Sequence, residues 1–163
     1  MNRSRATAFR RILLGWLLLT GVPGGPDSTG SGPPVAVIVH PDVPVNDVSV
    51  EELRRIFLGD RQFWNQDLRI TPLVPAQGSP TRAVLLNLSQ KTEAQYRHHW
   101  IAKVFRAEAM SQPKVVTSPA MLGDLVSGIA GAISLVEAKD VPRSVKVLTV
   151  SGKRPEETGY PLR

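Results

Sequence analysis

The side chains best suited to bind an anion lie together in the run QGSPTR, residues 77–82. Ser79 followed by Pro80 is a favoured helix start, with the serine as N-cap and the proline at the first helical position. The first turn of a helix exposes unpaired N–H groups and the positive end of the macrodipole, and both attract anions. Thr81 adds a hydroxyl donor, and Arg82 adds a planar charge that can make two hydrogen bonds to one oxyanion. We therefore expect oxyanion contacts from Gly78, Ser79, Thr81 and Arg82, with Gln77 as a possible additional contact.

The same run also has a purely structural interpretation. Serine followed by proline is a common way to begin a helix, whatever the helix binds. Ser118 and Pro119 repeat the pattern with no arginine nearby. Spacing alone therefore leaves two alternatives for residues 77–82, an anion site and an ordinary helix start.

Other polar residues offer little catalytic or metal chemistry. His98 and His99 are adjacent, so on a helix they point about 100° apart and cannot chelate one metal together. The chain has no cysteine, which excludes disulfides and thiolate sites. No serine lies in a nucleophile-elbow motif, and no acid, base and nucleophile can be assembled from the spacing. We expect a non-catalytic protein with no metal site and no cofactor.

The composition is that of a single globular domain. The chain has 163 residues, of which 42% are hydrophobic and 21% are charged. Its formal net charge is +6, and the basic residues after the N-terminal segment are scattered among acidic ones. Nucleic-acid-binding domains instead gather basic residues on one face. We therefore expect no nucleic-acid partner.

The first 34 residues have the pattern of a targeting segment and a linker. An arginine-rich start precedes an apolar run over residues 12–22, which is shorter than the roughly 20 residues of a membrane span. This pattern over residues 1–22 predicts a signal peptide. An uncleaved N-terminal anchor is the alternative, because no clear cleavage triplet follows. Residues 23–34 are rich in Gly, Pro and Ser and predict a linker. We expect export to the periplasmic or extracellular side, with possible membrane anchoring.

Strand-like and helix-like segments alternate through residues 35–163. Strands are expected at 35–40, 68–74, 115–117, 132–136 and 145–150, with a further extended segment at 43–48 and a polar, turn-rich tail after 150. Helices are expected at 49–58, 80–89, 93–106 and 119–129. Two of them begin with capping boxes, Ser49 with Glu52 and Thr92 with Gln95. This alternation predicts an α/β domain, a three-layer sandwich with a mixed, mostly parallel sheet.

Several segments, in the right order, resemble phosphate-type periplasmic solute-binding proteins. The segments are VIVHPDVPV at 37–45, VSVEELRRIFLGDRQFW at 48–64, GSPTR at 78–82, GIAGAISLV at 128–136 and GYPLR at 159–163. The resemblance covers about residues 35–163. It implies one lobe of a type-II solute-binding fold, as in a short, single-lobe member of the family.

The resemblance also implies a ligand, and the sequence departs from the family pattern at three positions. Phosphate, or a similar oxyanion, is the implied ligand, and Ser79, Thr81 and Arg82 match the family's phosphate loop. Pro80 stands where the family often has a glycine and removes one backbone donor. Pro75 stands near where an arginine often precedes the loop, and Ser134 replaces a glycine of the late strand.

Two hypotheses follow for the function. The first is an exported, non-catalytic domain that recognises phosphate in connection with transport, together with a membrane transporter or a second lobe in another chain. The alternative is an interaction or structural module that kept the fold and lost the ligand. A homo-oligomer is a possible form of that module.

Overall fold

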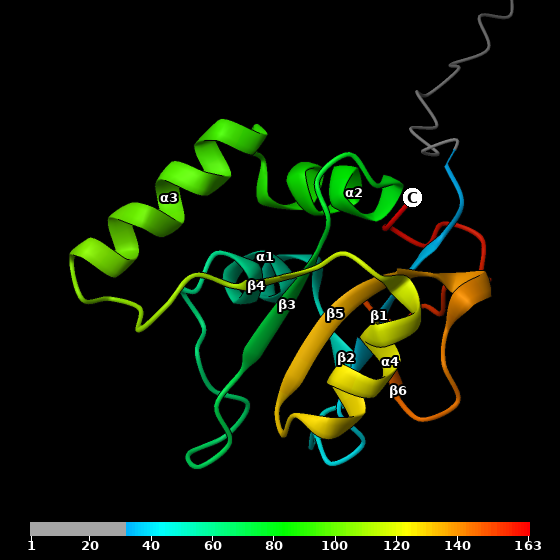
Figure 1. Ribbon diagram of the computed structural model, residues 1–163. Coiled ribbons are helices and arrows are strands. Elements are labelled where there is room, and N and C mark those ends of the chain that lie inside the picture. The colour runs from blue at the N-terminus through cyan, green and yellow to red at the C-terminus, as the bar shows by residue number, and fades with distance from the viewer. Residues whose placement is uncertain (1–31) are drawn as a thin grey trace, which may run out of the picture.

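A computed structural model describes residues 32–163, which form one six-stranded sheet covered on both faces by helices (Figure 1). The strand order is β2-β6-β1-β5-β3-β4. Three neighbouring pairs are parallel and two, both involving β1, are antiparallel. The strands are β1 (Val35–Val39), β2 (Asp47–Val48), β3 (Thr71–Pro75), β4 (Lys114–Val116), β5 (Ala132–Glu137) and β6 (Lys146–Val150). The predicted mixed, mostly parallel sheet is confirmed.

Four α-helices and one short 3₁₀ helix complete the three layers. They are α1 (Val50–Phe57), α2 (Pro80–Ser89), α3 (Glu93–Phe105), α4 (Pro119–Gly128) and η1 (Ala138–Asp140). Helix α4 packs on one face of the sheet through Leu122 and Val126, against Ile38 of β1 and Leu73 of β3. Helices α1, α2 and α3 contribute to the larger core on the other face, which is built on alternate residues of β1. Figure 1 shows α4 in front of the sheet, and α3 lying beyond α1 and α2.

The helices begin where the sequence predicts. Ser49 caps α1 and Thr92 caps α3, and each forms its complete capping box, with Glu52 and Gln95 respectively. Ser79 caps α2 by accepting a hydrogen bond from the Arg82 amide. Because each of these caps fixes a first turn, the starts of α1, α2 and α3 depend on residues only three positions apart.

Three details differ from the expectations. Strand β3 begins at Thr71 rather than residue 68, because the preceding residues form a turn in which the Trp64 amide donates to the Leu68 carbonyl at 2.8 Å. The extended segment at 43–48 forms a strand over only two residues. The polar tail supplies core residues: Tyr160 and Leu162 are buried, and the Tyr160 hydroxyl donates to the Val35 carbonyl.

The predicted signal peptide or anchor (1–22) and most of the predicted linker (23–34) lie outside the described residues. Within residues 32–163, no helix has both the length and the apolar character that a membrane crossing requires.

Strand β3 brings two helix starts to one edge of the sheet. It lies between β5 and β4 and runs parallel to both, so the carboxyl ends of all three strands meet at one edge of the sheet. Helix α2 follows β3 and helix α4 follows β4. The N-termini of α2 and α4 are therefore brought to the same edge, although 39 positions separate Pro80 from Pro119 in the chain.

Gly131, just before β5, is held closely against the start of β3. Its backbone φ is +74°, its carbonyl accepts hydrogen bonds from the Trp64 indole (2.9 Å) and the Thr71 amide (3.1 Å), and a Cβ would meet the Arg69 carbonyl. We expect Gly131→Ala to lower the free energy of unfolding by at least about 2 kcal/mol, through strain and this clash. Denaturant unfolding measures the change.

Gly128→Ala is the matched control, because a Cβ there meets nothing within 4 Å and its backbone conformation suits any residue. We expect it to be neutral or slightly stabilising. Equal stability of the two variants would contradict the role assigned to Gly131.

Candidate functional site

A hollow of about 150 Å³ lies where β3, β4 and β5 end and α2 and α4 begin. We call it the α2/α4 hollow. Ser79 and Thr81 line it from α2, and Thr117 and Ser118 line it from the start of α4. The structure therefore brings the Ser79-Pro80 and Ser118-Pro119 helix starts to one site.

The first turn of α2 has one free donor, the amide of Thr81. The Ser79 hydroxyl donates to the Ala76 carbonyl at 2.8 Å and accepts from the Arg82 amide at 3.1 Å, so its only proton is already used. Pro80 has no N–H, and the Ala83 amide bonds to the Ser79 carbonyl at 3.2 Å. The Thr81 hydroxyl lies 3.2 Å from the Ser79 hydroxyl and donates to it, because the Ser79 proton is already used. The Thr81 amide is left to face a ligand. Ser79 thus shapes the turn, and the Thr81 amide is its free donor.

The first turn of α4 offers a matching set of donors. Ser118 is the N-cap residue, yet its side chain makes no capping hydrogen bond. The Met121 amide bonds to the Ser118 carbonyl at 3.2 Å, and Pro119 has no N–H. The hydroxyls of Ser118 and Thr117 and the amide of Ala120 therefore remain available.

The charged groups that line the α2/α4 hollow are acidic. Glu137, at the end of β5, and Asp140, in η1, both reach it, and no Lys or Arg is among its lining residues. Glu137 is paired with Lys139 at 2.9 Å. An anion in this hollow is attracted by two helix N-termini and opposed by a nearby carboxylate. A ligand that carries a proton can instead donate it to that carboxylate.

Arg82 is buried away from the hollow, between α2 and α3. It is 4% exposed, and its guanidinium lies 4.8 Å from the centre of the Tyr96 ring. Its Nε and Nη2 donate to the two carboxylate oxygens of Glu93 at 3.0 and 2.6 Å. The oxyanion that Arg82 holds in this structure is thus a carboxylate of the same chain.

Gln77 binds the same Glu93 carboxylate, and Gly78 forms the turn between Gln77 and the start of α2. The Gln77 side-chain amide donates to Glu93 Oε1 at 3.0 Å. Gly78 has φ of +79° and is exposed, with open space where a Cβ would stand. The five residues predicted from the sequence therefore divide into two groups: Ser79 and Thr81 face the α2/α4 hollow, and Gln77 and Arg82 bind Glu93, with Gly78 as the turn.

Sequence reasoning missed Thr117, Ser118 and Glu137. In the sequence, Ser118 and Pro119 have the pattern of an ordinary helix start. The usable signal is that each Ser-Pro pair is the first helix start after a predicted strand, since parallel strands place their following helix starts at one edge. Neither spacing nor composition shows that β3 and β4 are neighbours.

The family described as "PBP superfamily domain" matches residues 33–158 of the chain. This protein belongs to the PBP superfamily. The match spans most of the chain, and the predicted resemblance to solute-binding proteins of this type is confirmed.

Solved structures with the same fold include three whose names refer to phosphate or to PstS. An ABC-type phosphate transport receptor from Vibrio cholerae aligns with TM-score 0.60 and 23% identity, over 76% of this chain and 48% of its own. A putative phosphate ABC transporter substrate-binding protein from Clostridium perfringens, with bound phosphate, aligns with TM-score 0.60 and 20% identity, over 76% and 47%. PstS from Borrelia burgdorferi aligns with TM-score 0.57 and 19% identity, over 76% and 49%.

This PBP-superfamily chain spans about half the length of the solved structures that it matches. At these identities the likeness establishes the fold. It agrees with the three-layer α/β architecture predicted from the alternation of strands and helices.

The pairing of Arg82 with Glu93 predicts a specific pH dependence. Hydrogen bonds from Arg82 are the main cause that holds the pKa of the Glu93 carboxyl below its ordinary value of 4.5. A lowered folded-state pKa contributes stability above pH 4.5 that is lost as the pH falls through the folded-state value. We expect Glu93→Gln to lower the free energy of unfolding by about 1–3 kcal/mol at pH 7, because Arg82 stays buried without its counter-charge.

Denaturant unfolding at pH 7 and pH 3 tests this expectation. The difference between wild type and Glu93→Gln should shrink at pH 3, because the stability that the lowered Glu93 pKa contributes is lost as the pH falls below 4.5 toward the folded-state value. Glu51→Gln is the control, since its ion pair with Arg54 is on the surface and is worth under about 1 kcal/mol. A Glu93→Gln effect that is the same at both pH values would contradict an ionic role.

Proposed function

We propose that this domain binds an inorganic oxyanion, phosphate, in the α2/α4 hollow and does so without catalysis. The observation that carries the proposal is the convergence of two helix N-termini, with Thr81 and Ser118 among the residues that line one hollow. The names of the relatives with the same fold, two of which refer to phosphate transport and one to bound phosphate, support the same ligand.

The proposed contacts follow from the free donors. The amides of Thr81 and Ala120 and the hydroxyls of Thr117 and Ser118 donate to the oxyanion. Ser79 holds the first turn of α2 in place through its cap. Arg82 contributes by anchoring that turn to α3 through Glu93. Gly78 lets the chain enter the helix with positive φ.

The acidic lining favours phosphate over sulfate. At neutral pH phosphate keeps a proton that it can donate to Glu137 or Asp140, whereas sulfate has none and meets only repulsion from these carboxylates. Because the hollow is open on one side, water competes for the same donors and the affinity should be modest.

In the cell, we propose that the domain acts on the outer side of the membrane. The arginine-rich, apolar start of the chain supports export. The relatives' link to ABC transport supports cooperation with a membrane transporter, or with a second lobe that closes over the hollow. If no anion binds, the alternative is that the domain serves as an interaction module.

Isothermal titration of the full-length chain with phosphate and with sulfate tests the proposal. We expect saturable binding of phosphate and weaker binding of sulfate. Ser118→Ala and Thr117→Val should each weaken phosphate binding about tenfold, because each removes a hydrogen bond to a charged ligand.

Ser127→Ala is the matched control on the same helix, since its hydroxyl bonds the Gly123 carbonyl at 2.8 Å and lies far from the start of α4. It should leave phosphate affinity unchanged. Absence of heat with both anions at millimolar concentration would refute phosphate binding and favour the interaction module.

A further inference from the structure

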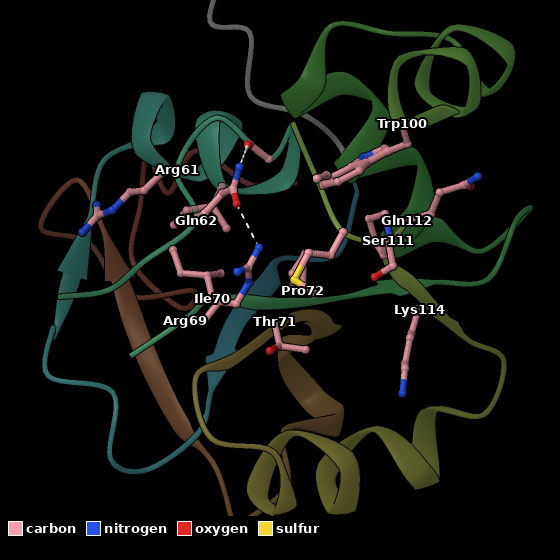
Figure 2. A pocket seen from close by; sticks show the side chains of 15 residues that line it. Arg61, Gln62, Arg69, Ile70, Thr71, Pro72, Trp100, Ser111, Gln112 and Lys114 are labelled. Atoms are coloured by element: carbon pink, nitrogen blue, oxygen red, sulfur yellow. Dashed lines mark hydrogen bonds between the residues drawn. The ribbon is translucent and has the colours of Figure 1, made fainter. Parts of the chain in front are cut away.

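A second hollow, of about 140 Å³, lies at the opposite end of β3 (Figure 2). Its walls come from the residues that enter β3, from the end of α1, from Trp100 of α3 and from the loop that leads to β4. We call it the Trp100 hollow. Strand β3 spans five residues, so roughly 13 Å of extended chain separates the Trp100 hollow from the α2/α4 hollow.

The charge of the Trp100 hollow is opposite to that of the α2/α4 hollow. Arg61, Arg69 and Lys114 line it, and its lining includes no acidic residue. Arg61 is already paired with Glu52 at 2.7 Å. Among residues 32–163, Arg69 and Lys114 have no carboxylate within ion-pair distance. Two positive charges at this hollow are therefore left without a counter-charge.

Arg69 is held in position although it is exposed. One terminal nitrogen donates to the Gln62 side-chain oxygen at 3.0 Å, and the guanidinium lies 5.4 Å from the centre of the Phe63 ring. Gln62 is in turn fixed by donating to the Glu108 carbonyl at 2.7 Å. Figure 2 shows Arg69 directed toward Gln62, with Trp100 across the hollow and Thr71 beside it. Because the bond to Gln62 uses one N–H, four of the five guanidinium donors remain for a ligand.

The rest of the lining is largely apolar. Ile70, Pro72, Trp100 and Met110 supply hydrophobic surface, and Thr71 and Ser111 supply hydroxyls. Trp100 is 4% exposed and is packed tightly against Gly59, so that wall is rigid. A cavity of about 150 Å³ can hold a benzene-sized body, and the Trp100 hollow has a similar volume.

We propose that the Trp100 hollow binds a small organic monoanion with a flat, ring-sized apolar body, whose carboxylate pairs with Arg69. The ring lies among Ile70, Pro72 and Trp100, and the carboxylate accepts hydrogen bonds from the guanidinium and the Thr71 hydroxyl. Lys114, on a flexible stem at the other wall, adds a second positive charge. This site is separate from the proposed phosphate site and does not depend on it.

Isothermal titration of the full-length chain with benzoate tests the site, with benzamide as an uncharged ligand of the same shape. We expect saturable binding of benzoate and at least about tenfold weaker binding of benzamide. Arg69→Gln should weaken benzoate binding at least about tenfold, and Lys114→Gln should weaken it less. Ala109→Leu, which fills the hollow and keeps the charges of Arg69 and Lys114, should abolish benzoate binding.

Arg143→Gln is the matched control, since it removes one exposed arginine that lines neither hollow. It should leave benzoate affinity unchanged. Equal affinity for benzoate and benzamide, or unchanged benzoate affinity in folded Arg69→Gln and Ala109→Leu, would overturn the proposal. Phosphate binding by Arg69→Gln should equal that of wild type, so failure at one hollow is distinguishable from failure at the other.

Discussion

The position of β3 between two parallel neighbours is the constraint on which the rest of this structure depends. Its carboxyl end lies at the edge of the sheet where α2 and α4 begin. Four hydroxyl side chains from these two segments, which are distant in the sequence, therefore line one hollow. Its amino end receives the turn that carries Arg69, and Gly131 locks that turn against β5 through its carbonyl and its lack of a side chain. One short strand thus defines both hollows.

The distribution of charge separates the two hollows chemically. Helix N-termini and hydroxyls supply the positive potential of the α2/α4 hollow, while Glu137 and Asp140 limit it. Arg82, the arginine nearest in sequence to this hollow, is paired with Glu93 and stacked on Tyr96. Burial raises the pKa of the Tyr96 hydroxyl to about 12. At the Trp100 hollow the reverse holds, because Arg69 is oriented by neutral partners, Gln62 and Phe63, and its charge is not paired with a carboxylate of residues 32–163. The two proposed ligands, a proton-bearing inorganic anion and an organic monoanion, follow from this difference in charge.

The run predicted to bind a free oxyanion instead binds the Glu93 carboxylate through two of its side chains. Gln77 and Arg82 hold an oxyanion with the bidentate geometry expected of an arginine fork, yet the oxyanion belongs to α3. The motif therefore joins α2 to α3. Of the predicted donors, only Thr81 keeps a backbone amide free at the α2/α4 hollow.

The sequence by itself determined the helix starts, the α/β class and the family likeness, because capping boxes, Ser-Pro pairs and hydrophobic periodicity act over a few residues. Ser49, Ser79 and Thr92 cap their helices as expected from neighbours only three positions away. Tertiary structure alone decided that Ser118 lies beside Thr81, that Glu93 takes Arg82, and that Tyr160 and Leu162 fill the core. These facts depend on strand order and on contacts between distant segments, such as the bond from the Tyr160 hydroxyl to the Val35 carbonyl. Pairing of that kind is selected by the packing of the whole sheet, so no local pattern carries it.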